Sequence, residues 1–294
     1  MISKKTKIGF IGTGIMGLPM AKNLIKSKYN VYSYVRNKNN HSFIKKNRIK
    51  IIHSIDDFYS EIDILILVVS ETSDVKQLLI GKDGLIAKKN KPSIIIDMST
   101  ICPIETINIS KVLQKNKISL IDAPVSGGEI GAIEGKLSIM IGGKKNIVTK
   151  IMPIFRILGE KITHIGGSGS GQVAKACNQI IVAQTVHAIS EAFIIADKFK
   201  VNKKNIREAL LGGFAKSKAL ETHGERILNK NYKPGFKTKL HAKDLRIARG
   251  ISVKKKLNLK GTNLVTQYMN ECNKNGHSEK DSSSYYLTVK EKNK

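Results

Sequence analysis

A short glycine pattern near the start of the chain constrains its fold more than any other feature. Gly12, Gly14 and Gly17 are spaced G-x-G-x-x-G, between an apolar segment, Ile8 to Ile11, and a helix-like segment, Leu18 to Lys28. A strand, a tight turn and a helix in this order form the phosphate-binding corner of a dinucleotide fold. The helix N-terminus offers free N–H groups to the phosphates. We therefore predict that this corner contacts a dinucleotide through Gly12, Gly14, Ile15, Met16 and Gly17.

Strand-like and helix-like segments alternate after this corner. The predicted strands are 31–35, 49–52, 62–69, 94–97, 118–122 and 137–141, and the predicted helices include 73–80 and 104–115. Such alternation predicts an α/β fold with an N-terminal, doubly wound parallel sheet of the Rossmann type. The stretch 122–135 is rich in small residues, and we predict a long loop there.

The second half of the chain has a different character. A run of glycine and serine, 166–171, predicts a domain boundary, and 172–199 is apolar nearly all round, which predicts a long buried helix. Further helices follow, with predicted turns at 212–213, 234–235 and 261, and the polar stretch 273–294 is expected to be partly mobile. The predicted domains are 1–166, which binds a dinucleotide, and 167–294, which is all-α and is joined through the long helix.

The net charge of +28 raises the question of a nucleic-acid partner. Arg, the residue that most often recognises bases and phosphates, occupies only seven positions, while Lys is scattered among many Ile and Asn residues. This pattern fits a compositional bias, and we expect no nucleic-acid partner.

The sequence also disfavours a membrane protein, a secreted protein and a metal-binding protein. No run of eighteen apolar residues and no signal peptide is recognised, so we expect a cytoplasmic protein with no membrane segment. Three well-separated cysteines indicate reduced thiols, and the seven His residues show no metal-ligand spacing, so no metal is expected.

Lys175 is the strongest candidate for proton transfer. It lies in an apolar part of the predicted long helix, where burial would lower the pKa of its ammonium toward neutrality. Asn178 and Gln179 follow three and four residues later and share its helix face. On the residues alone, a Lys whose ammonium extends from the helix into water fits equally well.

Two further groups are open to more than one interpretation. The loop 124–128, Pro-Val-Ser-Gly-Gly, offers consecutive N–H groups and a hydroxyl, which suits a carboxylate or simply a structural turn. Lys243 and Asp244 suggest an ion pair on a solvated helix face.

Five ordered motifs resemble those of the β-hydroxyacid dehydrogenases. They span residues 9–24, 97–100 (D-x-S-T), 122–135 (D-A-P-V-S-G-G-x-x-G-A-x-x-G), 171–178 (G-x-x-x-K-x-x-N) and 243–245 (K-D-L). The resemblance covers about residues 7 to 285. Within the family, 127–129, 212–215 and 231–241 are most similar to the tartronate semialdehyde (2-hydroxy-3-oxopropanoate) reductases.

The resemblance implies roles for individual residues. Lys175 would protonate the alkoxide formed by hydride transfer, and Asn178 would help to hold the substrate, whose carboxylate Ser126, Gly127 and Gly128 would bind. The residues implied at the cofactor are Val69, Ser70, Thr100 and Lys243. Ser70 stands where the family usually has Pro. A homodimer or homotetramer is also implied.

The implied activity is hydride transfer between NAD(P)H and a small carboxylate-bearing aldehyde or hydroxy acid. The first expectation is reduction of 2-hydroxy-3-oxopropanoate to glycerate. The alternatives are a 3-hydroxyisobutyrate dehydrogenase, a glyoxylate or succinic semialdehyde reductase, and a non-catalytic dinucleotide-binding module.

The end of the second predicted strand bears on the choice of cofactor. An NAD-selective site has an acid there that accepts hydrogen bonds from the ribose, but this chain has Val35, followed by Arg36 and Asn37. A guanidinium pairs well with a 2′-phosphate, although it also stacks on adenine in either cofactor. We therefore expect NADP(H) to be preferred, with NAD(H) as the second choice.

Overall fold

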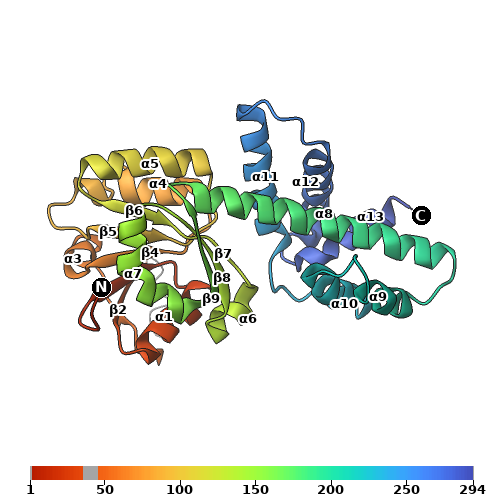
Figure 1. Cartoon of the computed structure of the whole chain (residues 1–294), viewed down its shortest axis with the longest axis horizontal. Coiled ribbons are helices and arrows are strands. Elements are labelled where there is room, and N and C mark those ends of the chain that lie inside the picture. Colours follow the sequence, from red (N-terminus) through yellow and green to blue (C-terminus); the bar gives the residue numbers. More distant parts are fainter. Residues whose placement is uncertain (1, 36–45, 294) are drawn as a thin grey trace. The chain divides into compact units, whose positions relative to one another are not determined.

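The computed structural model describes residues 2–35 and 46–293 of the 294-residue chain. It divides into two compact units, a sheet unit (Met1–Lys175) and a helical unit (Ala176–Lys294). The division falls inside helix α8 (Ser170–Lys198), whereas the sequence predicts a boundary between residues 166 and 167. Figure 1 shows both units.

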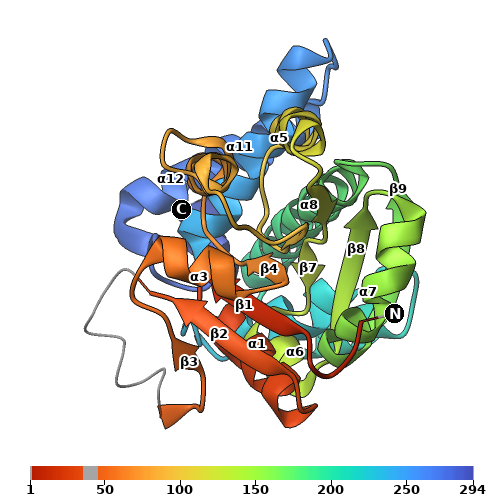
Figure 2. The ribbon, with the colours of Figure 1, turned by 90° about the vertical axis from the view of Figure 1, so that its left-hand side faces the viewer.

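Nine strands form one sheet among the described residues, in the order β3-β2-β1-β4-β5-β6-β8-β7, with β9 paired to β8. These are β1 (Lys7–Ile11), β2 (Asn30–Tyr34), β3 (Lys50–Ile51), β4 (Ile64–Leu67), β5 (Ile94–Asp97), β6 (Ser119–Asp122), β7 (Val125–Ser126), β8 (Leu137–Gly142) and β9 (Gly159–Gly166). Strands β1 to β6 pair in parallel, and Figure 2 shows β1 between β2 and β4. This order is that of a doubly wound dinucleotide-binding sheet, so the predicted fold class is confirmed.

Helices cover both faces of the sheet because its central strands are apolar on both sides. In β4, Ile64 and Ile66 join one core, and Leu65 and Leu67 join the other. The first core is closed by α1 (Gly17–Lys26), α6 (Gly128–Glu134) and α7 (Lys145–Leu158), and the second by α3 (Ile55–Glu61), α4 (Thr72–Ile80) and α5 (Pro103–Lys115). In Figure 1, α4 and α5 lie on one side of the strands, and α1 and α7 lie on the other.

The predicted long loop at 122–135 is wrong, because this stretch holds β7 and α6. Small residues suggested a loop, but Gly127 and Gly128 have positive φ angles of 132° and 63° and make the sharp turn between the two elements. Strand β8 is antiparallel to β6 and β7 and parallel to β9, so the sheet is parallel only as far as β6.

The helical unit is built around the part of α8 that it contains. The other helices are α9 (Lys203–Leu211), α10 (Glu225–Leu228), α11 (Thr238–Lys254), α12 (Lys260–Cys272) and α13 (Tyr285–Glu291). Apolar side chains of α8, α11, α12 and α13 form one core, which confirms the predicted helical second domain. Gly261 lies within α12, so the turn predicted there is wrong.

Helix α8 is less buried than its composition predicts. Its side chains Ile181 and Ile195 are 65% and 61% exposed, while Val186 and Phe193 are fully buried. By length and composition alone α8 could span a membrane, and 39% of its most apolar window is buried. The buried polar residues Gln172, Lys175 and Gln179 lie on the same helix, which is unusual for a lipid-facing segment.

The stretch 273–294, which the sequence predicts to be partly mobile, contains a buried helix, α13. Tyr285 and Val289 of α13 are buried in the core of the helical unit. Just before this helix, the buried carboxylate of Asp281 accepts N–H bonds from Gly235 (2.9 Å) and Phe236 (3.0 Å). Burial alone would raise the pKa of Asp281, but its hydrogen bonds hold that pKa well below its usual range. A short apolar cluster in a polar stretch thus fixes the end of the chain.

Candidate active site

The turn between β1 and α1 requires glycine at two positions, because a side chain at either would collide with the protein's own backbone. Gly12 has φ +100°, and a Cβ there would lie 2.1 Å from the carbonyl oxygen of Val68. A Cβ at Gly17 would lie 2.0 Å from the carbonyl oxygen of Gly12. Both contacts are far inside van der Waals distance, so the tight turn and the close packing of α1 depend on these glycines.

Gly14 differs from its two neighbours. A Cβ at this position would meet no atom of the described chain within 4 Å, so the fold itself does not demand glycine here. The helix that follows has neither a side-chain cap nor an acidic residue in its first turn, as far as the described residues show. Its N-terminal N–H groups and the bare Cα of Gly14 therefore fit the approach of a pyrophosphate.

The carboxyl ends of the central strands meet at one edge of the sheet. The N–H of Val68 donates to the carbonyl of Ile11 (2.9 Å), and the N–H of Val69 donates to the Ser99 hydroxyl (2.9 Å). The loops after β4 and β5 are thereby held side by side. Three of the predicted cofactor-binding residues lie on these loops: Val69, Ser70 and Thr100.

Ser126 lies on β7, at the end of the strand order, and the two glycines after it lead into α6. Ser126 pairs with Ser138 of β8, and α6 begins at Gly128, where an added Cβ would meet nothing within 4 Å. Helix α6 is held beside α1, because the amide of Asn23 donates to the carbonyl of Ala132 (2.9 Å). The helix that begins at the predicted carboxylate-binding turn therefore packs beside the helix that follows the glycine corner.

The start of α8 is fixed by a buried carboxylate that sequence reasoning missed. Asp122, at the end of β6, accepts N–H bonds from Gly169 (2.8 Å) and Gln172 (3.1 Å). Burial raises the pKa of Asp122, and these N–H bonds oppose that rise. A Cβ at Gly171 would lie 2.3 Å from the carbonyl oxygen of Met140, so this glycine allows the close approach.

The side chain of Gln172 ties α8 to the loop after β5. Its Nε2 donates to the carbonyl of Ser99 (2.8 Å), and its Oε1 accepts from the N–H of Ile101 (3.1 Å). Lys175 follows one turn later and is only 7% exposed. The structure thus anchors the first turn of α8 on both sides and buries the predicted proton donor, which disfavours the alternative of a Lys extended into water.

In the helical unit, Asn178 and Lys243 are joined by a hydrogen-bonded chain. Asn178 Nδ2 donates to Gln179 Oε1 (2.8 Å), and Gln179 Nε2 donates to Asp244 Oδ2 (2.7 Å). Lys243 Nζ lies 2.9 Å from Asp244 Oδ1, and both residues are buried. The expected ion pair is therefore present, but its predicted place on a solvated face is wrong.

The remaining predicted residues concern the adenosine end of the cofactor. Val35 lies directly after β2 and is half-buried. Arg36 and Asn37 lie outside the described residues, so their predicted contacts stay predictions. The described residues hold no group of three or more His, Cys, Asp or Glu side chains that could bind a metal ion.

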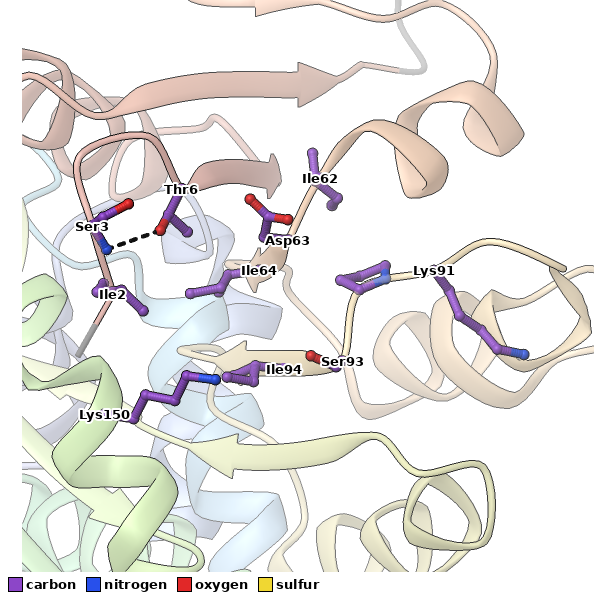
Figure 3. A pocket seen from close by; sticks show the side chains of 11 residues that line it. Ile2, Ser3, Thr6, Ile62, Asp63, Ile64, Lys91, Ser93, Ile94 and Lys150 are labelled. Atoms are coloured by element: carbon purple, nitrogen blue, oxygen red, sulfur yellow. Dashed lines mark hydrogen bonds between the residues drawn. The ribbon is translucent and has the colours of Figure 1, made fainter.

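A separate cavity of about 460 Å³ opens at the opposite edge of the sheet, by the amino ends of β4 and β5 (Figure 3). Its lining residues are Ile2, Ser3, Thr6, Ile62, Asp63, Ile64, Lys91, Pro92, Ser93, Ile94 and Lys150. Dinucleotides bind such sheets at the carboxyl ends of the strands, so this cavity is not the candidate site.

Comparison with known proteins agrees with this geometry. Residues 7–166 match the NAD-binding domain of 6-phosphogluconate dehydrogenase, and residues 169–289 match the NAD-binding family of NADP-dependent 3-hydroxyisobutyrate dehydrogenase. The chain is 40% identical to the 2-hydroxy-3-oxopropionate reductase of Escherichia coli (strain K12), over 95% of both chains. It is 35% identical to the probable 3-hydroxyisobutyrate dehydrogenase-like 1, mitochondrial, of Arabidopsis thaliana, over 89% of this chain and 78% of that one.

A solved structure extends the likeness to three dimensions. The 3-hydroxyisobutyrate dehydrogenase of Mycobacterium tuberculosis, with L-serine, superposes with a TM-score of 0.89 at 27% identity, over 97% of this chain and 99% of that one. Sequence and fold therefore agree along nearly the whole length. The chain belongs to the β-hydroxyacid dehydrogenase family and is an oxidoreductase that uses a nicotinamide dinucleotide.

Proposed function

We propose that this enzyme reduces 2-hydroxy-3-oxopropanoate to glycerate with NADPH. The observation that carries the proposal is the 40% identity to the Escherichia coli 2-hydroxy-3-oxopropionate reductase over 95% of both chains. The motif residues on which the resemblance rests are present, including Lys175, Asn178 and the Ser126–Gly128 turn.

The chain's own residues divide the work in this proposal. Ser126, Gly127 and Gly128 bind the substrate carboxylate through a hydroxyl and N–H groups, which orients the aldehyde. When bound, the reduced nicotinamide supplies the hydride to the aldehyde carbon. Lys175 Nζ gives a proton to the resulting alkoxide oxygen, and the same amine accepts that proton when the alcohol is oxidised. Asn178, three residues further along α8, holds the substrate.

A 3-hydroxyisobutyrate dehydrogenase that uses NAD is the second candidate. The observation in its favour is the close structural likeness to the Mycobacterium tuberculosis enzyme, with a TM-score of 0.89. The two candidates share the carboxylate site and the proton donor. They differ in the group next to the carboxylate, which is a hydroxyl in one substrate and a methyl in the other.

Steady-state kinetics on a panel of aldehyde acids tests the proposal. The panel consists of 2-hydroxy-3-oxopropanoate, 2-methyl-3-oxopropanoate, succinic semialdehyde and glyoxylate, each measured with NADPH and with NADH. We expect the highest kcat/KM for 2-hydroxy-3-oxopropanoate with NADPH. A higher kcat/KM for 2-methyl-3-oxopropanoate with NADH would replace the proposal by the second candidate.

We also propose that the enzyme works as a homodimer or homotetramer. Exposed apolar residues recur along α8 in the helical unit, namely Ile181, Ala188 and Ile195 at seven-residue intervals. Seven-residue spacing places them on one stripe of the helix, as at a helix–helix interface. Exposed apolar stripes of this kind mark association surfaces in soluble proteins.

A further inference from the structure

The hydrogen-bonded chain in the helical unit gives the amide of Asn178 a defined orientation. It runs from Asn178 Nδ2 to Gln179 Oε1 (2.8 Å), and from Gln179 Nε2 to Asp244 Oδ2 (2.7 Å). Gln179 and Asp244 are buried, so water does not compete freely for these bonds. Gln179 has no part in the proposed binding and proton-transfer roles of Ser126, Lys175 and Asn178.

Asp244, at the buried end of these hydrogen bonds, determines which group donates in each of them. An ionised carboxylate only accepts hydrogen bonds, so Asp244 requires the NH₂ group of Gln179 to face it. Gln179 must then turn its Oε1 toward Asn178, which in turn must offer its NH₂ group. The ammonium of Lys243, 2.9 Å from Asp244 Oδ1, compensates the buried charge on which this order depends.

We propose that Gln179 is a positioning residue that fixes Asn178 Oδ1 as a hydrogen-bond acceptor for a hydroxyl group of the substrate. With Nδ2 held by Gln179, Oδ1 points away from Gln179 and pairs only with a donor. The 2-hydroxyl of 2-hydroxy-3-oxopropanoate is such a donor, and the methyl of 2-methyl-3-oxopropanoate is not. This inference rests on the proposed function, in which Asn178 holds the substrate, and it extends that function to discrimination between hydroxyl and methyl.

The reason for a positioning residue is that an unsupported amide has two nearly equivalent orientations. If Asn178 were free to rotate by half a turn, its orientation would have to be fixed each time the substrate hydroxyl binds, and that ordering would weaken binding of the hydroxyl substrate. With Nδ2 held by Gln179, the Oδ1 acceptor is already in place before the hydroxyl arrives. Gln179 provides that constraint from the next position on the same helix.

The test compares Gln179→Met and Gln179→Glu with Ser190→Ala as the matched control. Ser190 is fully buried on the same helix, and its hydroxyl donates only to the carbonyl of Val186 (2.7 Å) in the contacts described. Gln179→Met removes both hydrogen-bonding groups at similar size. Gln179→Glu keeps an oxygen acceptor facing Asn178 Nδ2. Thermal unfolding and NADPH binding are measured for each variant, to establish that it is folded.

The expected result is a change in KM that depends on the substrate. Gln179→Met should raise KM for 2-hydroxy-3-oxopropanoate by about three- to tenfold, the effect of one neutral hydrogen bond. KM for 2-methyl-3-oxopropanoate and for succinic semialdehyde should stay within about twofold, a small fraction of one hydrogen bond. Gln179→Glu should retain more of the preference for the hydroxyl substrate than Gln179→Met, and Ser190→Ala should retain all of it.

Two outcomes would overturn the inference. One is an equal rise of KM for all substrates in Gln179→Met, which a purely structural role would produce. The other is an unchanged preference for the hydroxyl substrate in that variant. If Gln179→Met does not fold, loss of the preference in a folded Gln179→Glu overturns the inference instead. Failure of the proposed function is separate, because it would be seen in the wild-type enzyme as poor turnover of 2-hydroxy-3-oxopropanoate.

Discussion

At the scale of single residues, replacing Lys175 should slow the chemical step without weakening cofactor binding. Its ammonium is proposed to protonate the alkoxide, and the first turn of its helix is anchored by Asp122 and Gln172. Lys175→Ala should lower kcat by roughly 10²–10⁴, the usual contribution of a general acid. NADPH affinity, measured by fluorescence titration, should be nearly unchanged. Near-normal turnover would remove Lys175 from the mechanism.

Val35 is the residue on which cofactor choice can be tested. It follows β2 at the position where an NAD-selective site carries an acid, and it neither accepts a ribose hydrogen bond nor repels a phosphate. Wild-type enzyme should prefer NADPH by at least about tenfold in kcat/KM, equivalent to one charge-assisted hydrogen bond. Val35→Asp should shift that preference toward NADH.

Arg36→Ala supplies the second arm of this test. It should reduce the preference by weakening turnover with NADPH and leaving turnover with NADH nearly constant, because only the 2′-phosphate requires the guanidinium. Equal or better activity of the wild type with NADH would contradict the prediction and favour the NAD-dependent alternative.

Some of the residues around the site were within reach of sequence reasoning and others were not. Gly12, Gly14 and Gly17 follow from spacing, since a local turn determines what they must be. Asp122, Gln172 and the bond between Gln179 and Asp244 escaped notice because the bonded groups are about 50 to 70 positions apart in sequence and meet only in the folded units. The roles of the predicted site residues stay predictions until kinetics test them.

At the scale of elements, the β1–α1 turn predicts opposite effects for two glycines. Gly14→Ala adds a methyl that meets nothing within 4 Å, so the protein should unfold at nearly the wild-type temperature. NADPH affinity should fall, because the methyl occupies the path of the pyrophosphate. Gly17→Ala places a Cβ 2.0 Å from the Gly12 carbonyl and should lower stability by about 1–3 kcal/mol, the usual effect of overpacking.

Denaturant unfolding and NADPH titration of both variants check this contrast. A large loss of stability in Gly14→Ala would show that the fold, and not a ligand, requires glycine there. Wild-type NADPH affinity in that variant would place the pyrophosphate elsewhere.

Helix ends in this protein carry Lys where glycine is usual. Lys28, Lys117, Lys200, Lys230 and Lys256 all follow helices and have φ between 50° and 66°. At Lys117, two backbone bonds of about 3.0 Å close the end of α5, from its own N–H to Gln114 and from Ile118 to Leu113. Left-handed backbone costs a residue with a Cβ about 1–2 kcal/mol and costs glycine almost nothing.

Lys117→Gly should therefore raise the free energy of unfolding by about 1 kcal/mol, the lower end of that cost. Lys111→Gly, an exposed change inside α5, is the control and should lower stability by about 0.5–1 kcal/mol. Urea unfolding measures both. Destabilisation by Lys117→Gly equal to that of the control would mean that the Lys side chain contributes to the helix end.

Element prediction succeeded where apolar periodicity was strong and failed where tertiary contacts decide. Strand β5 was predicted with its observed bounds, because three consecutive Ile residues between loop-like segments favour a short buried strand. Helices α6 and α13 were missed because glycine-rich and serine-rich segments resemble loops. Their helical turns are held by the two cores that contain Ala132 of α6 and Tyr285 of α13.

At the scale of the whole molecule, the excess of Lys extends to backbone positions that other residues usually occupy. Among the described residues, all six non-glycine positions with positive φ are Lys or Arg. Lys thus occupies even sites where the backbone favours Gly or Asn, as expected if composition, and not a selected binding surface, produced the excess charge. This supports the expectation that the enzyme needs no nucleic-acid partner.

The exposed stripe on α8 predicts how the whole molecule associates. Ile181 and Ile195 are 65% and 61% exposed in the single chain and lie on one stripe of α8, and Phe199, just after the helix, is 77% exposed. If the stripe on α8 is an interface, each Ile gains about 1.5–3 kcal/mol by burial on association. Ile195→Glu should then weaken association by at least about tenfold per subunit contact.

Sedimentation velocity at micromolar concentration measures this effect. The wild type should sediment as a dimer or tetramer, and Ile195→Glu should shift the distribution toward monomer with helical content unchanged. Leu257→Glu is the control, because Leu257 is 52% exposed but lies beyond the end of α11 and not on α8. A monomeric wild type, or an assembly that both variants leave intact, would show that the exposed stripe on α8 does not drive association.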